Sequence, residues 1–250
     1  MSTNNLVSII TPCYNSEKFI GTTINSVLDQ SYTNWEMIIV DDLSTDNSVK
    51  IIEKQQTKDI RIKCIRLTKN SGAAVCRNTA IKIASGRYIA FLDSDDLWVA
   101  SKLEKQIGFM KANNSVLSFG CYQKIDEAGN LIADSSVFAK EKISYTDMLT
   151  SNKIGCLTAM YDANKLGKVY MPLIKKRQDY ALWLKILKTT PLAHGFEDNL
   201  GYYRLRKASV SSSKIEMLKW NWKMFREIEK LSFIKAAYCV FMNVVYKVFK

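Results

Sequence analysis

The first hundred residues alternate short apolar runs with longer segments in which apolar residues recur at helical spacing. The apolar runs predict buried β-strands at residues 6–10, 35–40, 62–67 and 87–92. The segments between them predict helices at residues 16–30, around Val49 to Ile52, and at residues 73–84. Because strand and helix alternate three times before the fourth strand, the pattern predicts an α/β fold with a parallel sheet and helices on both faces.

Polar residues follow each of the four predicted strands. They lie at residues 11–15, 41–42, 69–72 and 93–96. In parallel sheets of this kind, ligands bind beyond the carboxyl ends of the strands, where these clusters converge. We therefore expect a binding site at this edge of the sheet.

The last of these clusters contains three carboxylates within four residues: Asp93, Asp95 and Asp96. Their mutual repulsion favours a nearby cation, and hard oxygen ligands suit Mg²⁺ or Mn²⁺. The alternative is a solvated acidic turn in which Asp96 caps a helix that starts at Leu97-Trp98. The convergence of four strand ends favours the site. Neither G-x-G-x-x-G nor G-x-x-x-x-G-K occurs, so neither a dinucleotide fold nor a P-loop ATPase is supported.

The 250 residues allow one large domain or two small ones. Six cysteines are scattered without a C-x-x-C pair, and His194 is the only histidine, so we expect free thiols in a reducing cytoplasm and no zinc site. We interpret His194 as structural. The polar N-terminus lacks the basic and apolar regions of a secretory signal.

The net charge of +12 is unevenly distributed. Residues 1–139 carry 15 Lys+Arg and 15 Asp+Glu, whereas residues 140–250 carry 21 and 9. The excess predicts a polyanionic partner for the second part: a phosphate-bearing ligand, a nucleic acid or an anionic membrane surface. No recognised nucleic-acid-binding motif is present, so we do not expect nucleic acid.

Two segments of the second part carry candidate functional residues. Residues 178–187 predict a helix with Asp179 in its first turn, either a functional carboxylate or an ordinary acidic residue that favours the helix dipole. From residue 214 the chain is rich in aromatic residues and lysine, and residues 236–246 are uncharged but too few to span a bilayer. This tail is either an interfacial helix or one that packs on the domain or on a second subunit. The first alternative takes as membrane anchors Trp220, Trp222, Phe225 and Tyr238.

Four motifs occur in order at the predicted strand ends. They are Val7 to Asn15 (VSIITPCYN), Val40 to Asp46 (VDDLSTD), Asn70-Ser71-Gly72 with Arg77-Asn78, and Leu92 to Asp96 (LDSDD). Together they resemble family 2 glycosyltransferases of the GT-A fold, from about Leu6 to Ser213. The resemblance implies a Rossmann-like, mostly parallel sheet. It divides the chain into a GT-A domain (1–213), with a nucleotide-sugar half (1–100) and an acceptor half (101–213), and a helical tail (214–250).

The resemblance assigns the nucleotide of a UDP-sugar to the first two strand ends. Thr11, Pro12 and Tyr14 would form the wall against which the base stacks. Asp42, beside Asp41, would accept a hydrogen bond from N3–H of uracil.

At the other two strand ends, the resemblance places Arg77 near the base and the phosphates. Asp93-Ser94-Asp95 looks like the D-x-D motif of the family, in which Asp95 and Asp93 hold Mn²⁺ or Mg²⁺ and Asp96 supports them. The metal would neutralise the departing UDP.

The resemblance also gives Asp179 a role, as the general base that deprotonates the acceptor hydroxyl in an inverting transfer. Gln178 stands where the family usually has glutamate. The segment from Tyr202 to Ser211 resembles the family's closing Y-R-x-H-x-x-S-x-S segment, with Arg206 in place of the histidine. Arg204 and Arg206 would then contact the diphosphate.

These assignments imply an inverting hexosyltransferase that uses UDP-glucose or UDP-galactose and a lipid-diphosphate-linked saccharide acceptor. The expected pathway is synthesis of a bacterial surface polysaccharide such as O-antigen lipopolysaccharide or capsule. The expected location is cytoplasmic, peripheral on the inner face of the plasma membrane, with an anionic lipid surface as partner. The alternative is a non-catalytic nucleotide-binding or membrane scaffold of the same fold, which the retained aspartates disfavour.

Overall fold

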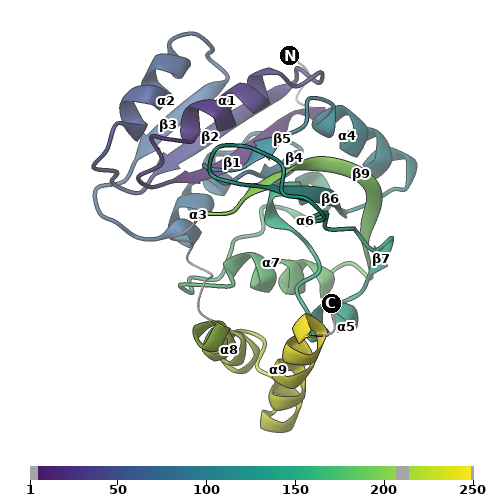
Figure 1. Ribbon diagram of the computed structural model, residues 1–250. Coiled ribbons are helices and arrows are strands. Elements are labelled where there is room, and N and C mark those ends of the chain that lie inside the picture. The colour runs from purple at the N-terminus through teal and green to yellow at the C-terminus, as the bar shows by residue number, and fades with distance from the viewer. Residues whose placement is uncertain (1–4, 207–213, 249–250) are drawn as a thin grey trace.

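The first half of the central sheet is parallel, as the sequence predicts. The computed structural model describes residues 5–206 and 214–248. Its first four strands are β1 (Val7–Cys13), β2 (Trp35–Asp41), β3 (Ile62–Arg66) and β4 (Tyr88–Phe91). They pair in the order β3-β2-β1-β4, and every pair is parallel (Figure 1).

The second half of the sheet is mixed and out of sequence order. Beyond β4 the order continues β8-β6-β9-β5, and β7 also pairs with β9. These strands are β5 (Leu97–Trp98), β6 (Leu117–Ile125), β7 (Lys142–Ile143), β8 (Met160–Asp162) and β9 (Ala193–Arg204). Only β6 and β9 pair in parallel; the other pairs are antiparallel. This extension carries β9 back to the loop that follows β4.

Helices cover both faces of the sheet, which confirms the predicted α/β architecture. One face carries α1 (Ile20–Leu28), α2 (Ser48–Gln56) and α4 (Lys102–Ala112), and the other carries α3 (Ala73–Ile83), α5 (Tyr145–Thr150) and α7 (Gln178–Leu187); the short α6 (Ala163–Leu166) follows β8 (Figure 1). Successive strand residues point to opposite faces, so Ile9 packs with the first group and Ile10 with the second. The sheet therefore separates two apolar cores.

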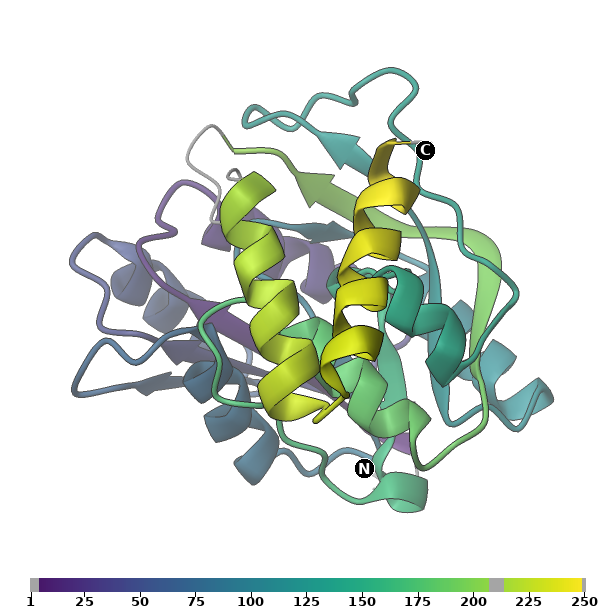
Figure 2. The same cartoon turned by 90° about the horizontal axis from the view of Figure 1, so that it is seen from below.

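The C-terminal helices form a further layer beneath α7. They are α8 (Lys214–Lys223), a π-helical segment η3 (Met224–Ile228) and α9 (Phe233–Val248) (Figure 2). Phe225 is fully buried and joins the core that contains α7. Asn243 Nδ2 donates to the Leu149 carbonyl at 3.1 Å, which ties α9 to α5. The inner side of the tail thus packs on the domain, and the prediction of Phe225 as a membrane anchor is wrong.

Local details correct or complete the other expectations. Leu97 and Trp98 form a strand, and the next helix begins at Lys102, so the prediction of Asp96 as a helix cap is wrong. All six cysteines are free. His194 Nδ1 lies 3.1 Å from Ser115 Oγ. In the part of the chain that the structure describes, no helix is long and apolar enough to cross a bilayer.

Candidate active site

The four parallel strands end beside one another, which brings the predicted polar clusters to one edge of the sheet. The backbone N–H of Asp42, after β2, donates to the Cys13 carbonyl of β1 at 2.8 Å. The N–H of Leu92, after β4, donates to the Ile10 carbonyl at 3.1 Å. The N–H of Leu67, after β3, donates to the Asp41 carbonyl at 2.9 Å. The predicted convergence is therefore observed.

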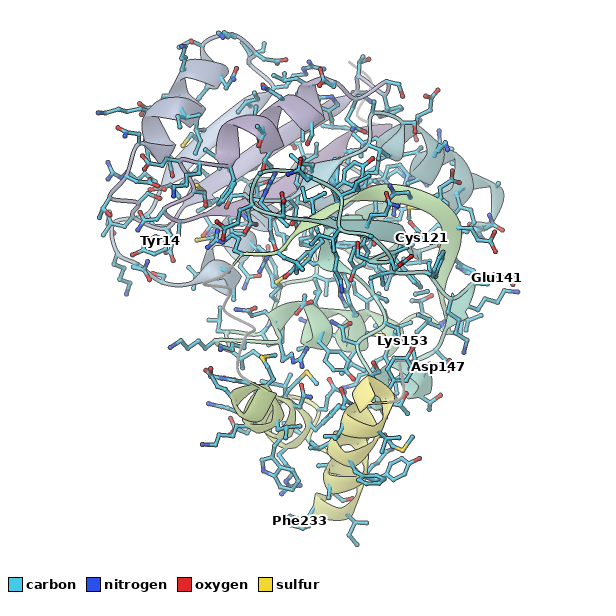
Figure 3. The ribbon with its side chains drawn as sticks, in the orientation of Figure 1. Tyr14, Cys121, Glu141, Asp147, Lys153 and Phe233 are labelled. Atoms are coloured by element: carbon cyan, nitrogen blue, oxygen red, sulfur yellow. The ribbon has the colours of Figure 1, made fainter. Side chains whose placement is uncertain are left out.

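The end of β1 carries a buried hydroxyl, and the loop that follows it carries an exposed aromatic ring. The side chain of Tyr14 is 48% exposed and stands out from the molecule (Figure 3). Thr11 is fully buried, and its Oγ1 has no hydrogen-bond partner among the described residues. Asn15 has a positive φ of 46°, and its Oδ1 accepts from the N–H of Thr45 at 2.9 Å, which holds the loop in place. Tyr14 thus offers an open face for a flat ring to stack on.

The carboxylate of Asp42 holds the loop that leads into α3. Its Oδ1 accepts from the N–H of Ser71 at 2.7 Å, and its Oδ2 accepts from the N–H of Gly72 at 2.8 Å. Gly72 has φ = 88°, a conformation that residues with a side chain rarely adopt. Both oxygens of Asp42 are therefore engaged within the protein, although each retains a second lone pair.

The neighbouring Asp41 has a free buried acceptor. Its side chain is fully buried, and its Oδ2 accepts from the N–H of Ser44 at 3.0 Å and lies 3.6 Å from Arg66 Nε. Its Oδ1 is buried with no hydrogen-bond partner among the described residues. An unsatisfied buried oxygen is costly. Because this atom is closed off from the surface, a ligand N–H reaches it only if the surrounding loops move.

The acidic cluster after β4 is held by contacts from three different elements. Asp93 pairs with the buried guanidinium of Arg77 on α3. Ser94 Oγ lies 2.7 Å from Ser16 Oγ, at the end of the β1 loop. Asp96 Oδ1 accepts from the backbone N–H of Arg204 at 2.8 Å, at the end of β9. Asp93 and Asp96 are thereby fixed on either side of Asp95.

Burial and mutual repulsion make this cluster electrostatically unfavourable. Burial raises the pKa of Asp95, and the charge of Asp93 raises it further. The pKa of Asp96 is raised well above its usual range by burial and by the charges of Asp95 and Asp93. A cation placed among these carboxylates would relieve the repulsion.

A divalent metal fits the site if the ligand supplies part of its coordination shell. Among the described residues, no three or more His, Cys, Asp or Glu side chains are grouped as a complete metal cage. Mg²⁺ is commonly held by one or two carboxylates together with substrate phosphates. Arg206 provides a cation at this place in the structure, since its Nη1 lies 3.1 Å from Asp95 Oδ2. Asp93 and Asp95 are thus suitable protein ligands.

The two predicted diphosphate-binding arginines differ in their surroundings. Arg204 is buried, and its Nε donates to the Asp95 carbonyl at 2.8 Å. Its Nη1 donates to the carbonyls of Asp126 and Glu127, at 3.1 and 3.0 Å. Arg204 therefore holds backbone in place, whereas Arg206 is partly exposed and faces the acidic cluster. Of the two, Arg206 is the better placed to reach a phosphate.

Asp179 lies in the first turn of α7 and is partly exposed. Asn152 Nδ2 donates to its Oδ2 at 3.3 Å. The residue before the helix, Arg177, has φ = 70°, an unusual conformation for a residue with a side chain. This sharp entry into α7 sets the direction of its first turn.

The charges of Asp179 and of the acidic cluster act on the same three side chains: Tyr122, Arg77 and Cys156. Burial raises the pKa of Tyr122 to about 12, and the charges of Asp96 and Asp179 add to the rise. Burial acts to lower the pKa of Arg77, but the charge and hydrogen bond of Asp93 and the charges of Cys156 and Asp179 together raise it above its ordinary value. Burial raises the pKa of Cys156, which also feels Asp93 and Asp179.

Tyr122 and Cys156 are residues that sequence reasoning missed. Tyr122 lies within β6, and Cys156 begins a short 3₁₀ turn, η2 (Cys156–Thr158). Neither belongs to a recognisable motif, so only the folded chain shows that both feel the charges of Asp96 and Asp179.

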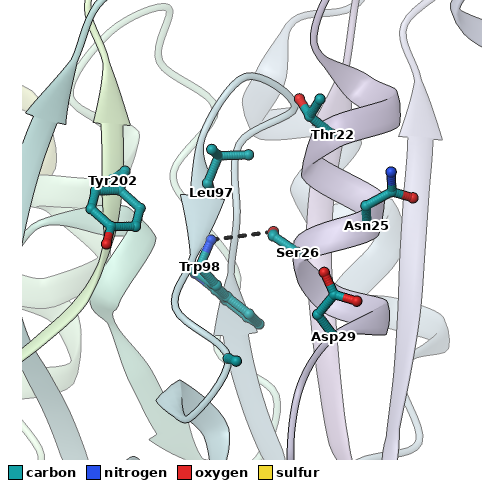
Figure 4. Close-up of a pocket in the computed structure, with 8 residues that line it drawn as sticks. Thr22, Asn25, Ser26, Asp29, Leu97, Trp98 and Tyr202 are labelled. Carbon is teal, nitrogen blue, oxygen red and sulfur yellow. Dashed lines mark hydrogen bonds between the residues drawn. The ribbon is translucent and has the colours of Figure 1, made fainter. Parts of the chain in front are cut away.

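A separate pocket lies between α1 and β5 (Figure 4). It has a volume of about 290 Å³ and is lined by Thr22, Asn25, Ser26, Asp29, Leu97, Trp98, Ala100 and Tyr202. The backbone N–H of Trp98 donates to Ser26 Oγ at 3.2 Å across it. None of the predicted site residues lines this pocket.

Several known proteins are similar to this chain in sequence and in fold. The family described as Glycosyl transferase family 2 matches residues 8–166. The putative teichuronic acid biosynthesis glycosyltransferase TuaG of Bacillus subtilis (strain 168) is 47% identical over 234 residues, which are 94% of this chain and 92% of that protein. The UDP-Glc:alpha-D-GlcNAc-diphosphoundecaprenol beta-1,3-glucosyltransferase WfgD of Escherichia coli is 45% identical over 222 residues, 87% of this chain and 84% of that protein.

A known crystal structure is similar to this chain in fold. The crystal structure of S. aureus TarS 1-349 in complex with UDP has a TM-score of 0.69 and 23% sequence identity. The match covers 94% of this chain and 69% of that one, so almost the whole chain, including most of the C-terminal layer, follows a known architecture.

Proposed function

The chain belongs to glycosyl transferase family 2 and is a glycosyltransferase, and on this premise we propose that it transfers a hexose, with inversion, from a UDP-sugar to a saccharide on a lipid diphosphate. UDP-glucose or UDP-galactose is the favoured donor. The E. coli relative, 45% identical, is named for UDP-glucose and a diphosphoundecaprenol-linked acceptor. The B. subtilis relative is named for teichuronic acid biosynthesis, which supports a role in making a bacterial surface polysaccharide.

The observation that carries the proposal is that the charges of Asp93 and Asp179 both act on Arg77, which pairs with Asp93. Inverting transfer needs a base on one side of the anomeric carbon and stabilisation of the leaving group on the other. In the proposed step, the acceptor oxygen forms a bond to the anomeric carbon while the bond from that carbon to the UDP oxygen breaks. Asp179 takes the acceptor proton, and the electron pair leaves with UDP.

The donor is bound at the strand ends. Tyr14 stacks on the base beside Pro12 and Thr11, and Asp42 accepts from the uracil N3–H through a lone pair that the loop amides leave free. Asp42 also holds the Ser71-Gly72 loop. A hydrogen-bond acceptor at this position favours uracil, whose N3–H is a donor.

The diphosphate is bound at the acidic cluster. Asp93 and Asp95 hold Mn²⁺ or Mg²⁺, which supplies positive charge to the departing diphosphate. Arg77 fixes Asp93, and Asp96 fixes the β9 backbone at Arg204. Arg206 moves from Asp95 to the diphosphate when the site is loaded.

We also propose that the protein works on the inner face of the plasma membrane as a peripheral protein. Its acceptor carries a lipid, and the positive charge of residues 140–250 suits an anionic lipid surface. A non-catalytic scaffold of the same fold is disfavoured, because the aspartates of the D-x-D motif and Asp179 are all present.

The test is a panel of UDP-sugars with a synthetic lipid-diphosphate acceptor, with the product linkage determined by NMR. We expect transfer from UDP-glucose or UDP-galactose and loss of transfer in Asp179→Asn. Asp198→Asn is the matched control, because Asp198 is a partly exposed aspartate that pairs with Lys105 away from the site. Transfer by Asp179→Asn at the wild-type rate would reject the base assignment.

A further inference from the structure

The outer side of α9 is an apolar surface with no covering element in the described structure. Ala236, Cys239 and Asn243 lie on one side of the helix and are buried. The rest of the helix surface carries large apolar residues that are exposed by 38–81%, which we call the α9 outer face: Phe233, Ile234, Tyr238, Phe241 and Val244. The spacing of Ile234, Tyr238 and Phe241 is i, i+4, i+7, so their side chains form a continuous stripe.

The stripe continues onto the preceding helix. The rings of Phe233 and Trp222 pack edge to face, with centroids 5.1 Å apart. Leu218, one turn before Trp222, is also exposed. Because α8 and α9 lie side by side on the underside of the molecule (Figure 2), the apolar surface spans both helices and is far larger than an isolated exposed residue.

The charges around this surface are mostly positive; the exposed Glu227 of η3 lies 3.7 Å from Lys223. The segment from Phe233 to Val248 contains no Asp or Glu. Lys219, Lys223, Lys230 and Lys235 are all exposed on the same layer. Two copies of such a surface would bring like charges together, whereas a bilayer with anionic headgroups would attract them and accept the apolar side chains.

We propose that the α9 outer face docks on an anionic lipid bilayer, with α9 lying in the membrane interface. This inference rests on the proposed lipid-linked acceptor and adds the docking residues and the orientation of the molecule. Tyr238 places an apolar ring in the bilayer and its hydroxyl at the headgroups. The exposed lysines contact anionic headgroups, each adding a modest, salt-sensitive attraction.

The orientation follows from the layer between the membrane and the sheet. The α7 helix, which carries Asp179, lies between the sheet and the α8–α9 layer (Figure 1). Lys176 Nζ, two residues before α7, lies 2.6 Å from Glu216 Oε2 of α8. Docking therefore holds the start of α7 at a fixed distance from the lipid surface. At that distance, the saccharide of a lipid-diphosphate acceptor would reach Asp179.

The test is co-sedimentation of the full chain with lipid vesicles. We expect binding to vesicles in which about a third of the lipid is phosphatidylglycerol, weaker binding to pure phosphatidylcholine, and release by salt. The double variant I234E/F241E should lower the fraction bound by roughly tenfold or more. The matched control is Ile60→Glu, since Ile60 is an apolar residue 91% exposed in the turn between α2 and β3.

Two results would overturn the inference. One is that I234E/F241E binds anionic vesicles as the wild type does, with an unchanged circular dichroism spectrum. The other is a wild-type dimer that the double variant turns into a monomer while vesicle binding stays the same, which would make this surface a self-association interface.

A second measurement separates this inference from the proposed function. I234E/F241E should transfer sugar to a short-chain, water-soluble diphosphate acceptor at the wild-type rate, but lose transfer to an acceptor embedded in vesicles. If the wild type binds vesicles but transfers to neither acceptor, the proposed function fails and the docking surface stands. If both proteins use the embedded acceptor equally, the docking surface fails.

Discussion

Carboxylates at the two ends of the parallel strands have pKa shifts of opposite sign. Glu36, at the start of β2, is buried and accepts from Ser8 Oγ and the Ser85 N–H at 2.6 Å each and from Lys63 Nζ at 2.7 Å. Burial acts to raise its pKa, but these bonds outweigh burial and the pKa is lowered. At the other end, Asp95 has its pKa raised by burial and by Asp93.

The difference separates a carboxylate that stabilises the fold from carboxylates that lower its stability. Glu36 is satisfied by groups of the protein itself and links β1, β2, β3 and the end of α3. In the acidic cluster after β4, Arg77 pairs with Asp93 and Arg206 with Asp95, yet the pKa values of Asp95 and Asp96 stay raised. A bound cation would relieve the repulsion that remains. Removing a charge should therefore have opposite effects at the two ends.

The largest expected effect is at Asp179, which completes the site. Asp179→Asn removes the proton acceptor and should lower kcat by about 10² to 10⁴. UDP binding should stay unchanged, because the base acts on the acceptor side. Steady-state kinetics and a UDP titration measure the two separately. A loss of UDP affinity as large as the loss of rate would assign Asp179 to the donor site instead.

The next effect is at Asp95. Asp95→Asn removes a carboxylate that holds the metal, which stabilises the charge of the departing diphosphate. The variant should therefore lower kcat by roughly 10² to 10³. Thermal unfolding without metal should be unchanged or shifted upward, since one repelling charge is gone. Because asparagine has the same size and shape as aspartate, a change in stability would reflect the lost charge and not a change in packing. A marked drop in the unfolding midpoint would show that Asp95, like Glu36, stabilises the fold.

Glu36→Gln should give the reverse pattern. The variant leaves the Lys63 ammonium without its charged partner and weakens the bonds from Ser8 and Ser85, so we expect a loss of about 2 kcal/mol in the free energy of unfolding. Turnover per folded molecule should equal that of the wild type. Urea unfolding and kinetics check both parts, and a specific loss of turnover would join Glu36 to the active site.

The smallest effect is a pH dependence at Glu36. Its pKa is lower in the folded chain than the ordinary value of 4.5, so its contribution is present above that value and is lost as the pH falls through the folded pKa. The stability difference between wild type and Glu36→Gln should therefore be full at neutral pH and shrink in acid. A stability difference that stays constant down to strong acid would contradict the claim that the ionised carboxylate of Glu36 stabilises the fold.

Local patterns predicted the first half of the fold because its information is local. The strands from Val7 to Phe91 are apolar runs joined by helices, and each polar cluster directly follows its strand, so the position of Asp95 was predictable. The pairing of β6 with both β8 and β9 joins segments far apart in the sequence, and periodicity does not encode such pairing.

The site residues divide in the same way. The family resemblance supplied Asp179, but not the engagement of Asp42 by loop amides, which depends on the φ of Gly72 and the path of the loop. Composition marked the tail as aromatic and basic, yet it could not tell that Phe225 points inward while Tyr238 points outward. Those facts follow from packing in three dimensions.

The most direct test of the contrast between the two ends is a calorimetric titration of UDP with and without Mn²⁺, on wild type, Asp95→Asn and Glu36→Gln. The account predicts that Mn²⁺ strengthens UDP binding to wild type and Glu36→Gln, and that Asp95→Asn loses this enhancement. Equal UDP affinity in all three proteins, with and without Mn²⁺, would contradict the claim that the acidic cluster after β4 is completed by a bound cation.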